Sequence, residues 1–328
     1  MNIEVAFKNK NVLVTGGAGF IGSHIAKYLV QCGANVRVID NLINGFRSNI
    51  ASLESLPNFE FIEGDITDLA FCKMATKDME FVSHQAALGS VPRSMLFPEK
   101  TNEINVTGFL NMLIAAKGNK VRKFVYASSS SVYGDEYTLP KIESKIGNPL
   151  SPYAVSKYTN ELYAKVFASS FNMKILGFRY FNIFGPFQDP DGQYAAVIPI
   201  FISKILRNEP FYVNGDGKQT RDFTYVDNAV QANVKGLLCE NEEAFGEVFN
   251  IAFGENYTLM DLVALLEKHL GLQATVLHRE DRPGDIRDSL ANIDKARSIL
   301  GYHPSHSFED GIIETTRFFK DKYTAGNQ

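Results

Sequence analysis

The chain has 328 residues and a formal net charge of -4, and hydrophobic and charged residues make up 45% and 21% of it. This is the balance of an ordinary globular protein, so it argues against a disordered chain and against a nucleic-acid-binding protein with a basic stripe. No segment approaches the roughly 18 consecutive apolar residues that a membrane span requires. We therefore expect a soluble, cytoplasmic protein that binds neither nucleic acid nor membrane.

The spacing of the cysteines and histidines indicates whether disulfides or a metal site are expected. Cys32, Cys72 and Cys239 lie far apart and show no CxxC spacing, which is typical of reduced thiols in a cytosolic protein. The six histidines are scattered along the chain. We expect no structural metal.

In the first half of the chain, short apolar runs alternate with longer helical patterns. The runs cover residues 12–14, 36–39, 59–62, 81–82, 124–127 and 175–178. Such alternation predicts parallel strands joined by crossover helices, hence an α/β fold with a doubly wound, mostly parallel Rossmann sheet. Ligands of these sheets bind beyond the carboxyl ends of the strands, so the chemistry is expected in the loops that follow them.

The alternation of strands and helices ends at about residue 181. After it, loops rich in glycine and proline, such as 185–192, are interspersed with single predicted helices. This predicts a smaller, mixed α/β substrate lobe covering the sheet. The run 248–252 again has the pattern of a buried strand. We therefore expect an NAD-binding Rossmann domain over 1–180, rejoined near 224–252, and a nucleotide-sugar-binding lobe over 181–328.

A glycine-rich turn, Gly16–Gly22, follows the first predicted strand and opens a helix that contains Ile21, Ile25 and Leu29. Glycines let the backbone approach a pyrophosphate closely, and the helix N-terminus supplies amide donors. This context predicts a dinucleotide site, although a plain strand-to-helix turn has the same pattern.

Two acids follow predicted strands in positions that suit a dinucleotide. Asp40 ends the second strand, where a carboxylate accepts hydrogen bonds from the adenosine ribose and repels a 2′-phosphate, which favours NAD over NADP. Asp65 follows the third strand and is placed to meet the adenine amino group. An ordinary turn acid is the alternative for both residues.

Tyr153 and Lys157 have the i, i+4 spacing that brings two side chains onto one face of a helix. A nearby ammonium, together with the positive ring of an oxidised nicotinamide, favours the phenolate of a tyrosine. The pair therefore predicts a redox enzyme that carries its own base. An exposed lysine beside a half-buried tyrosine is the alternative.

Several motifs in this order resemble the extended short-chain dehydrogenase/reductase family over essentially the whole chain, and within it the nucleotide-sugar 4-epimerases. They are Thr15–Gly22, His84–Ala87, Ser128–Gly134, Tyr153 with Lys157, and Arg179–Asn182. The resemblance implies bound NAD. The cofactor-binding residues that it implies are Gly16, Gly19, Phe20, Ile21, Gly22, Asp40, Asn41, Gly45, Asp65, Ile66, Ala86, Ala87, Asn105, Ser128, Tyr153, Lys157 and Tyr180.

The resemblance also implies the catalytic roles. Tyr153 is the base that takes the proton of the sugar 4-hydroxyl while a hydride leaves C4 for nicotinamide. Lys157 holds the nicotinamide ribose and lowers the tyrosine pKa, and Ser129 hydrogen-bonds the reacting oxygen. The 4-keto sugar then rotates and takes the hydride back on its other face, so NAD is regenerated in each turnover and stays tightly bound.

The residue types at the positions of Ser130 and Ser131 differ between enzymes of the family that catalyse different reactions. Dehydratases that resemble this chain carry an Asp-Glu pair at these positions, and the related decarboxylases carry a Glu, to move protons. The serines leave no carboxylate ready for elimination. Ser131 alternatively only caps a loop.

The second lobe matches residues that hold uridine diphosphate in such epimerases. Arg221 and Arg282 are suited to clamp a diphosphate, and Asp285 to accept a ribose hydroxyl, although either arginine could be a surface ion-pair partner instead. The substrate-binding residues implied are Gly89, Ser90, Ser129, Ser130, Tyr153, Asn182, Ala196, Val197, Tyr212, Arg221, Arg282, Asp285 and Ser289.

By this resemblance, Ser289 occupies the position of a bulky tyrosine in strict UDP-galactose 4-epimerases, and serine leaves room for a 2-acetamido group. An incidental small residue where a loop meets a helix is the alternative. The run 87–94, with Gly89 and Ser90, further resembles epimerases that prefer N-acetylated sugars. The resemblance thus implies a homodimeric UDP-N-acetylglucosamine 4-epimerase that interconverts UDP-GlcNAc and UDP-GalNAc for surface polysaccharide. A UDP-uronic-acid 4-epimerase (UDP-GlcNAcA or UDP-GlcA) and a non-catalytic NAD-binding sensor are the alternatives.

Overall fold

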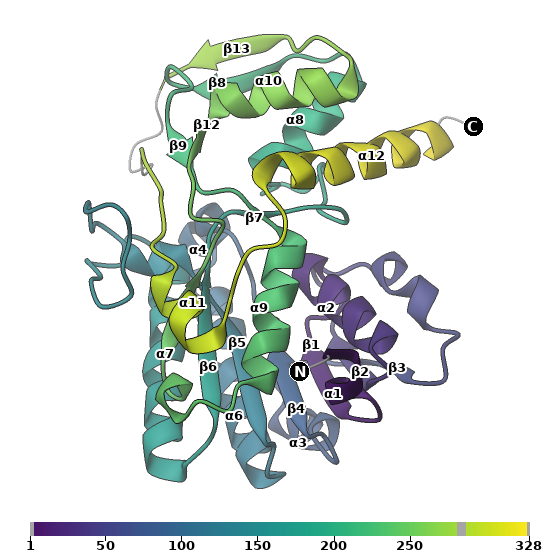
Figure 1. The fold of residues 1–328 in the computed structure, drawn as a ribbon, viewed down its shortest axis with the longest axis vertical. Coiled ribbons are helices and arrows are strands. Elements are labelled where there is room, and N and C mark those ends of the chain that lie inside the picture. Colours follow the sequence, from purple (N-terminus) through teal and green to yellow (C-terminus); the bar gives the residue numbers. More distant parts are fainter. Residues whose placement is uncertain (1–2, 281–286, 327–328) are drawn as a thin grey trace.

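The computed structural model describes residues 3–280 and 287–326. A parallel sheet with helices on both faces forms the lower part of the molecule in Figure 1, and a smaller lobe of helices and short strands lies above it. The loops between the two parts follow the carboxyl ends of the sheet strands. The site is therefore expected where the two parts meet.

The main sheet has seven strands in the order β11-β6-β5-β4-β1-β2-β3, and every neighbouring pair is parallel. Each predicted apolar run forms one of these strands, so the predicted doubly wound sheet is confirmed. The chain changes direction between β1 and β4, which places the switch point of the sheet there. The strands are β1 (Asn11–Thr15), β2 (Asn35–Asp40), β3 (Phe59–Glu63), β4 (Phe81–His84), β5 (Lys123–Ser129), β6 (Ile175–Tyr180) and β11 (Val248–Ile251).

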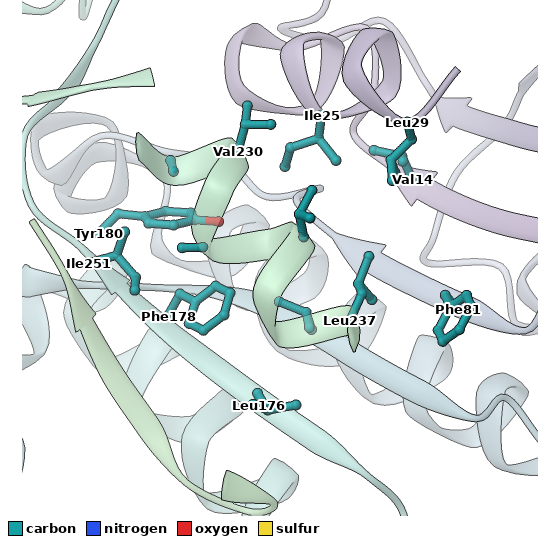
Figure 2. Close-up of a cluster of buried hydrophobic side chains, with 14 of the residues drawn as sticks. Val14, Ile25, Leu29, Phe81, Leu176, Phe178, Tyr180, Val230, Leu237 and Ile251 are labelled. Atoms are coloured by element: carbon teal, nitrogen blue, oxygen red, sulfur yellow. The ribbon is translucent and has the colours of Figure 1, made fainter. Parts of the chain in front are cut away.

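One face of the sheet is covered by α2 (Phe20–Gln31), α9 (Val226–Leu238) and α11 (Asp294–Leu300). Successive strand residues point to opposite faces, so Val12 and Val14 of β1 pack against these helices. Figure 2 shows Ile25 of α2 and Val230 of α9 converging above the strands. The predicted helix with Ile21, Ile25 and Leu29 is thus confirmed as α2.

The opposite face is covered by α3 (Leu69–Ala75), α6 (Phe109–Gly118) and α7 (Pro152–Phe171), against which Leu13 of β1 packs. α7 begins where the Ser151 hydroxyl accepts a hydrogen bond from the Ala154 amide at 3.1 Å, with proline at the first helical position. This start sets Tyr153 and Lys157 in the first two turns of the helix.

Shorter pieces complete this part of the chain. They are α1 (Ile3–Phe7), α4 (Val91–Leu96), α5 (Pro98–Asn102), the π-helical turn Glu103–Gly108, and the 3₁₀ turns Arg47–Asn49, Ala51–Leu53, Ser130–Tyr133 and Glu242–Ala244. The three cysteines are buried, and none of them forms a disulfide. Over the described ranges, the helices are too short or too polar to cross a membrane, and His, Cys, Asp and Glu do not gather in a metal-binding group.

The second lobe has its own apolar core. A parallel pair of strands, β8 and β13, packs with three helices, of which α10 starts at a capping box between Thr258 and Asp261. The elements are β7 (Ile183–Phe184), α8 (Val197–Leu206), β8 (Phe211–Asn214), β9 (Thr220–Arg221), β10 (Thr224–Tyr225), β12 (Tyr257–Thr258), α10 (Leu259–Leu270), β13 (Val276–Arg279) and α12 (Phe308–Gly326). Because β11 pairs with β6, the chain returns to the main sheet between pieces of this lobe. The exact domain boundaries stay a prediction.

Candidate active site

A cleft of about 700 Å³ lies at the carboxyl ends of β1, β2, β4 and β5. Its walls come from both parts of the molecule: the loops after these strands and the first turns of α7 on one side, and residues 188–196 before α8 on the other. The cleft lies at the switch point between β1 and β4, where ligands of such sheets bind.

The glycine turn forms one end of the cleft, and its backbone leaves no room for side chains. Gly16 has φ +64°, and a Cβ there would lie 2.7 Å from the Ala86 backbone. A Cβ on Gly22 would lie 2.2 Å from the Gly16 carbonyl oxygen. Gly19 precedes α2 without a capping side chain, so the first amides of the helix are left to an anion. This cradle fits a dinucleotide pyrophosphate.

Asp40 lies against this turn. Its Oδ2 accepts a hydrogen bond from the Ala18 amide at 3.0 Å, and its Oδ1 accepts one from the Leu42 amide at 2.8 Å. Burial raises the pKa of Asp40, and these backbone amides partly oppose that rise. The Gly19 and Asn41 amides also interact with the carboxylate, so a ribose hydroxyl would share its oxygens with these backbone donors.

Asp65 lies behind Asn41, away from the cleft. Its Oδ2 accepts a hydrogen bond from Asn41 Nδ2 at 2.8 Å, and Asn41 lines the cleft whereas Asp65 does not. Asp65 also accepts hydrogen bonds from the amide and hydroxyl of Thr67, both at 2.8 Å. The predicted contact of Asp65 with the adenine stays a prediction, and its visible role is to orient Asn41.

His84 joins the ends of β1 and β4 below the centre of the cleft. Its Nδ1 lies 2.9 Å from Thr15 Oγ1, and that oxygen also accepts a hydrogen bond from the Ala86 amide at 3.2 Å. Burial, and next the charge of Lys157, lower the pKa of His84 to about 3. The imidazole is therefore neutral at physiological pH and acts as a structural link.

Tyr153 and Lys157 enter the cleft from α7, as their spacing predicts. Lys157 Nζ lies 6.0 Å from the centre of the Tyr153 ring and donates a hydrogen bond to the Ala127 carbonyl at 2.8 Å. The lysine is 3% exposed, and burial lowers its pKa to about 8. The ammonium is thus held near the phenol, is mostly protonated at neutral pH and loses its proton as the pH rises through about 8.

The expected lowering of the Tyr153 pKa is not produced by the protein's own groups. Burial raises this pKa, because a low-dielectric site disfavours the phenolate, and the Ser129 hydroxyl only partly opposes the rise. The pKa of a base in this position therefore depends on a further positive charge in the cleft.

Ser129 ends β5 and lines the cleft beside Tyr153. Its hydroxyl accepts hydrogen bonds from the Ser131 amide at 3.2 Å and from the Ser131 hydroxyl at 3.0 Å, and its own proton is directed to the Tyr153 phenol. Ser131 thus orients Ser129, and Ser129 caps the 3₁₀ turn that starts at Ser130. The carboxylates among the described lining residues are those of Asp40 and Asp189, and neither stands next to Ser129 in the chain.

The cleft gathers most of the predicted cofactor residues. Those that line it are Gly16, Gly19, Phe20, Ile21, Gly22, Asp40, Asn41, Gly45, Ile66, Ala86, Ala87, Ser128, Tyr153, Lys157 and Tyr180. Asn105 does not line it. Its Oδ1 accepts a hydrogen bond from the Leu88 amide at 2.7 Å and its Nδ2 donates to Ser156 Oγ at 3.1 Å, so it fixes the loop after β4 to α7.

The predicted substrate residues divide into two groups. Gly89, Ser90, Ser129, Tyr153 and Ala196 line the cleft. Ser130, Asn182, Val197, Tyr212, Arg221 and Ser289 do not line it, and Arg282 and Asp285 lie outside the described residues.

Within the second group, Arg221 and Ser289 lie together. Arg221 Nη1 donates to the carbonyl of Thr220 at 2.8 Å, and the Ser289 amide donates to that same carbonyl at 3.2 Å. Their roles toward a nucleotide stay predictions.

Other residues line the cleft without having been predicted. Gln85 and Arg93 lie close in sequence to residues that were predicted to bind the cofactor or the substrate. Their place in these sequence runs is the signal by which they could have been predicted. Gln188 and Tyr194 come from the loop before α8, where the resemblance covered only Ala195, Ala196 and Val197. The remaining ones are Ile39, Ile43, Asn44, Phe46, Gly64, Leu88, Ile104, Ala127, Ile183, Asp189 and Gly192.

Comparisons with known proteins identify the family. Residues 12–252 match the NAD dependent epimerase/dehydratase family. A putative UDP-glucose 4-epimerase of Methanocaldococcus jannaschii is 38% identical over 94% of this chain and 98% of its own length.

Two solved structures are similar over nearly their whole length. The UDP-N-acetylglucosamine 4-epimerase of Methanobrevibacter ruminantium M1 has a TM-score of 0.90 at 39% identity, covering 96% of this chain and 99% of that one. The UDP-glucuronic acid 4-epimerase of Bacillus cereus, solved with UDP-glucuronic acid and NAD, has a TM-score of 0.88 at 34% identity, covering 95% and 100%. The chain belongs to the NAD dependent epimerase/dehydratase family, and its cofactor is NAD.

Proposed function

We propose that the protein is a UDP-sugar 4-epimerase that interconverts UDP-GlcNAc and UDP-GalNAc. The observation that carries this proposal is the meeting of Ser129, Tyr153 and Lys157 in one cleft with the glycine cradle. A hydroxyl donor, a phenol and an ammonium at one place are the groups needed to move a proton from a sugar hydroxyl during its oxidation. The same assembly argues against a protein that only senses NAD.

When bound, NAD accepts the hydride of the sugar C4 and later returns it to the opposite face. Tyr153 takes the proton of the 4-hydroxyl in the first half of the reaction and gives a proton back in the second. Ser129 donates a hydrogen bond to the same sugar oxygen. Lys157, anchored on the Ala127 carbonyl, holds its ammonium near the phenol, and together with the positive ring of oxidised NAD it would oppose the rise in the Tyr153 pKa that burial causes.

The residues beside Ser129 support epimerisation over elimination. Dehydration of a hexose needs an acid and a base next to C5 and C6. Here Ser131 engages Ser129, and Ser130 lies outside the cleft lining. Proton transfer is therefore confined to Tyr153, which suits oxidation and reduction at a single carbon.

The loop after β4 supports an N-acetylated substrate. Gly89 and Ser90 line the cleft, and a methyl group built on Gly89 would meet nothing within 4 Å. This open space offers room for a sugar substituent such as a 2-acetamido group. The relative from M. ruminantium bears the name of an epimerase for this sugar.

A UDP-uronic-acid 4-epimerase is the second candidate. The B. cereus relative is solved with UDP-glucuronic acid, and Arg93 brings a cation to the lining of this cleft. A guanidinium is suited to hold a carboxylate on the sugar. Comparing acidic with neutral sugars decides between the two candidates.

We also propose a homodimer built on α7. Val155, Leu162 and Val166 are 51%, 50% and 53% exposed, and their spacing places them on one face of the helix. Ile114 of α6, which packs beside α7, is exposed as well. A stripe of this kind is typical of a surface that a second copy covers. Cytoplasmic location and a role in surface polysaccharide stay predictions.

The function is tested by incubating the purified protein separately with UDP-GlcNAc, UDP-Glc and UDP-GlcNAcA, without added reductant, and following the products by NMR. We expect UDP-GlcNAc to be converted to UDP-GalNAc fastest. Faster conversion of the acid transfers the assignment to the second candidate. Lack of conversion of all three sugars contradicts 4-epimerase activity on them.

A further inference from the structure

A contact that the proposed chemistry does not use joins the two walls of the cleft. Arg93 belongs to α4, in the wall that follows β4, and Tyr194 belongs to the loop before α8 in the opposite wall. The Arg93 guanidinium carbon lies 4.9 Å from the centre of the Tyr194 ring. A cation over an aromatic face at this distance is attracted to it, so the contact holds the walls together.

Arg93 is fixed at its other end. Its Nη1 donates a hydrogen bond to Asn44 Oδ1 at 2.9 Å, and Asn44 lies in the cleft-lining loop after β2. The Arg93 amide donates to Ser90 Oγ at 3.2 Å, and Ser90 has φ 95°, an uncommon value for a serine. Arg93 thus links the loop expected to hold the dinucleotide with Ser90, the residue expected beside the hexose.

The Tyr194 hydroxyl is the observation that points to a ligand. It is buried and, among the described residues, has no hydrogen-bond partner, whereas buried polar groups are nearly always paired. The ring is held by Arg93, and the residue lines the cleft two positions before Ala196. The hydroxyl is covered by protein atoms in this structure, so it would reach an oxygen of a bound molecule once the wall that carries Tyr194 shifts on binding.

We propose that Arg93 and Tyr194 form a clasp over the bound substrate, in which the Tyr194 hydroxyl donates a hydrogen bond to an oxygen of the sugar portion of the nucleotide sugar. The assignment to the sugar follows from the connection of the clasp to Ser90. The identity of that sugar, UDP-GlcNAc, rests on the proposed function. Both residues are specificity-determining groups outside the proton-transfer set of Ser129, Tyr153 and Lys157.

The test uses Tyr194→Phe, which removes the hydroxyl and keeps the ring that contacts Arg93. Binding of UDP-GlcNAc and of UDP to the NAD-loaded protein is measured by calorimetry, and bound NAD by absorbance. We expect Tyr194→Phe to weaken UDP-GlcNAc about tenfold, the loss of one hydrogen bond, and to leave UDP affinity and NAD content unchanged. Tyr137→Phe, at a position 88% exposed, is the matched control and should bind both ligands like the wild type.

Arg93→Met tests the other half of the clasp by removing the cation from the Tyr194 ring. We expect a loss of UDP-GlcNAc affinity of the same order, with no additional loss when it is combined with Tyr194→Phe, because the two residues act as one unit. Unchanged UDP-GlcNAc affinity in Tyr194→Phe overturns the clasp. An equal loss for UDP, or a loss of NAD alone, overturns the assignment to the sugar.

These binding measurements are independent of turnover. If the wild type binds UDP-GlcNAc and the clasp variants weaken it, but no epimerisation occurs, the proposed function fails while the clasp stands. If the wild type binds UDP-GlcA and not UDP-GlcNAc, the N-acetylated substrate fails, and the same titrations with UDP-GlcA decide on the clasp.

Discussion

Glu161 and Arg179 form a buried, two-point ion pair between α7 and β6. Arg179 Nε donates to Glu161 Oε1 at 2.9 Å and Nη2 donates to Oε2 at 2.8 Å, and the side chains are only 7% and 3% exposed for Glu161 and Arg179 respectively. The Ser128 hydroxyl also donates to Glu161 Oε1 at 2.5 Å. Glu161 lies one turn beyond Lys157 in α7. The pair therefore sets the position of the helix that carries Tyr153 relative to the end of β5 that carries Ser129.

Breaking this pair is expected to destabilise the fold. Glu161→Gln leaves the Arg179 charge buried without its partner, so the free energy of unfolding should fall by roughly 3–5 kcal/mol. Denaturant unfolding measures the change. Glu314→Gln, which breaks the exposed pair with Arg317, is the control and should cost about 1 kcal/mol or less. Equal effects of the two substitutions contradict a structural role for the buried pair.

Removing the proposed base should stop the reaction without emptying the site. Tyr153→Phe keeps the ring in α7 and removes the phenolic proton acceptor, so turnover should fall at least about 100-fold, the lower limit typical of a positioned base. NAD content by absorbance should match the wild type. Near-normal conversion of UDP-GlcNAc by this variant refutes the assignment.

Acid should weaken the fold through His84. Its folded pKa of about 3 lies below its ordinary value of 6.5, so the unfolded chain binds more protons between these values. Stability from this group is therefore complete above pH 6.5 and is lost as the pH falls toward 3. His84→Gln cannot titrate, so it should lose about 2 kcal/mol less than the wild type between pH 7 and pH 5. Unfolding curves at the two pH values check this, and parallel losses contradict it.

Filling the position of Ser289 should change the substrate range. Ser289→Tyr is expected to reduce turnover of UDP-GlcNAc at least about tenfold and to spare UDP-Glc, because only the first sugar carries a 2-acetamido group. Parallel assays with both sugars give the ratio. Since Ser289 does not line the cleft among the described residues, unchanged turnover of UDP-GlcNAc removes it from the specificity argument.

A charge in the exposed stripe of α7 should separate the proposed dimer. Leu162→Glu places a carboxylate where an apolar partner face is expected, so light scattering should report a smaller mass than for the wild type. Leu272→Glu, at a position 43% exposed in the second lobe, is the matched control. A wild-type mass equal to one chain contradicts the dimer itself.

Local patterns in the sequence determined the strands, the glycine turn and the Tyr153–Lys157 helix. These patterns are short-range constraints: alternating apolar runs, a positive φ that favours glycine at position 16, and the i, i+4 spacing in a helix. They act between residues close in sequence, so they do not depend on tertiary contacts. The same patterns located most residues of the cofactor cleft, because the ends of parallel strands lie at one edge of the sheet.

Only the tertiary structure decided which distant residues meet. Three contacts join separate elements: the Arg93–Tyr194 cation–π contact, the Glu161–Arg179 ion pair and the hydrogen bond from the Leu88 amide to Asn105. Periodicity within a single element does not encode such contacts. The pKa of Tyr153 is a second example: the spacing with Lys157 favours the phenolate, whereas burial in the folded protein raises the pKa. Desolvation depends on everything packed around a group, so it exists only once the fold is complete.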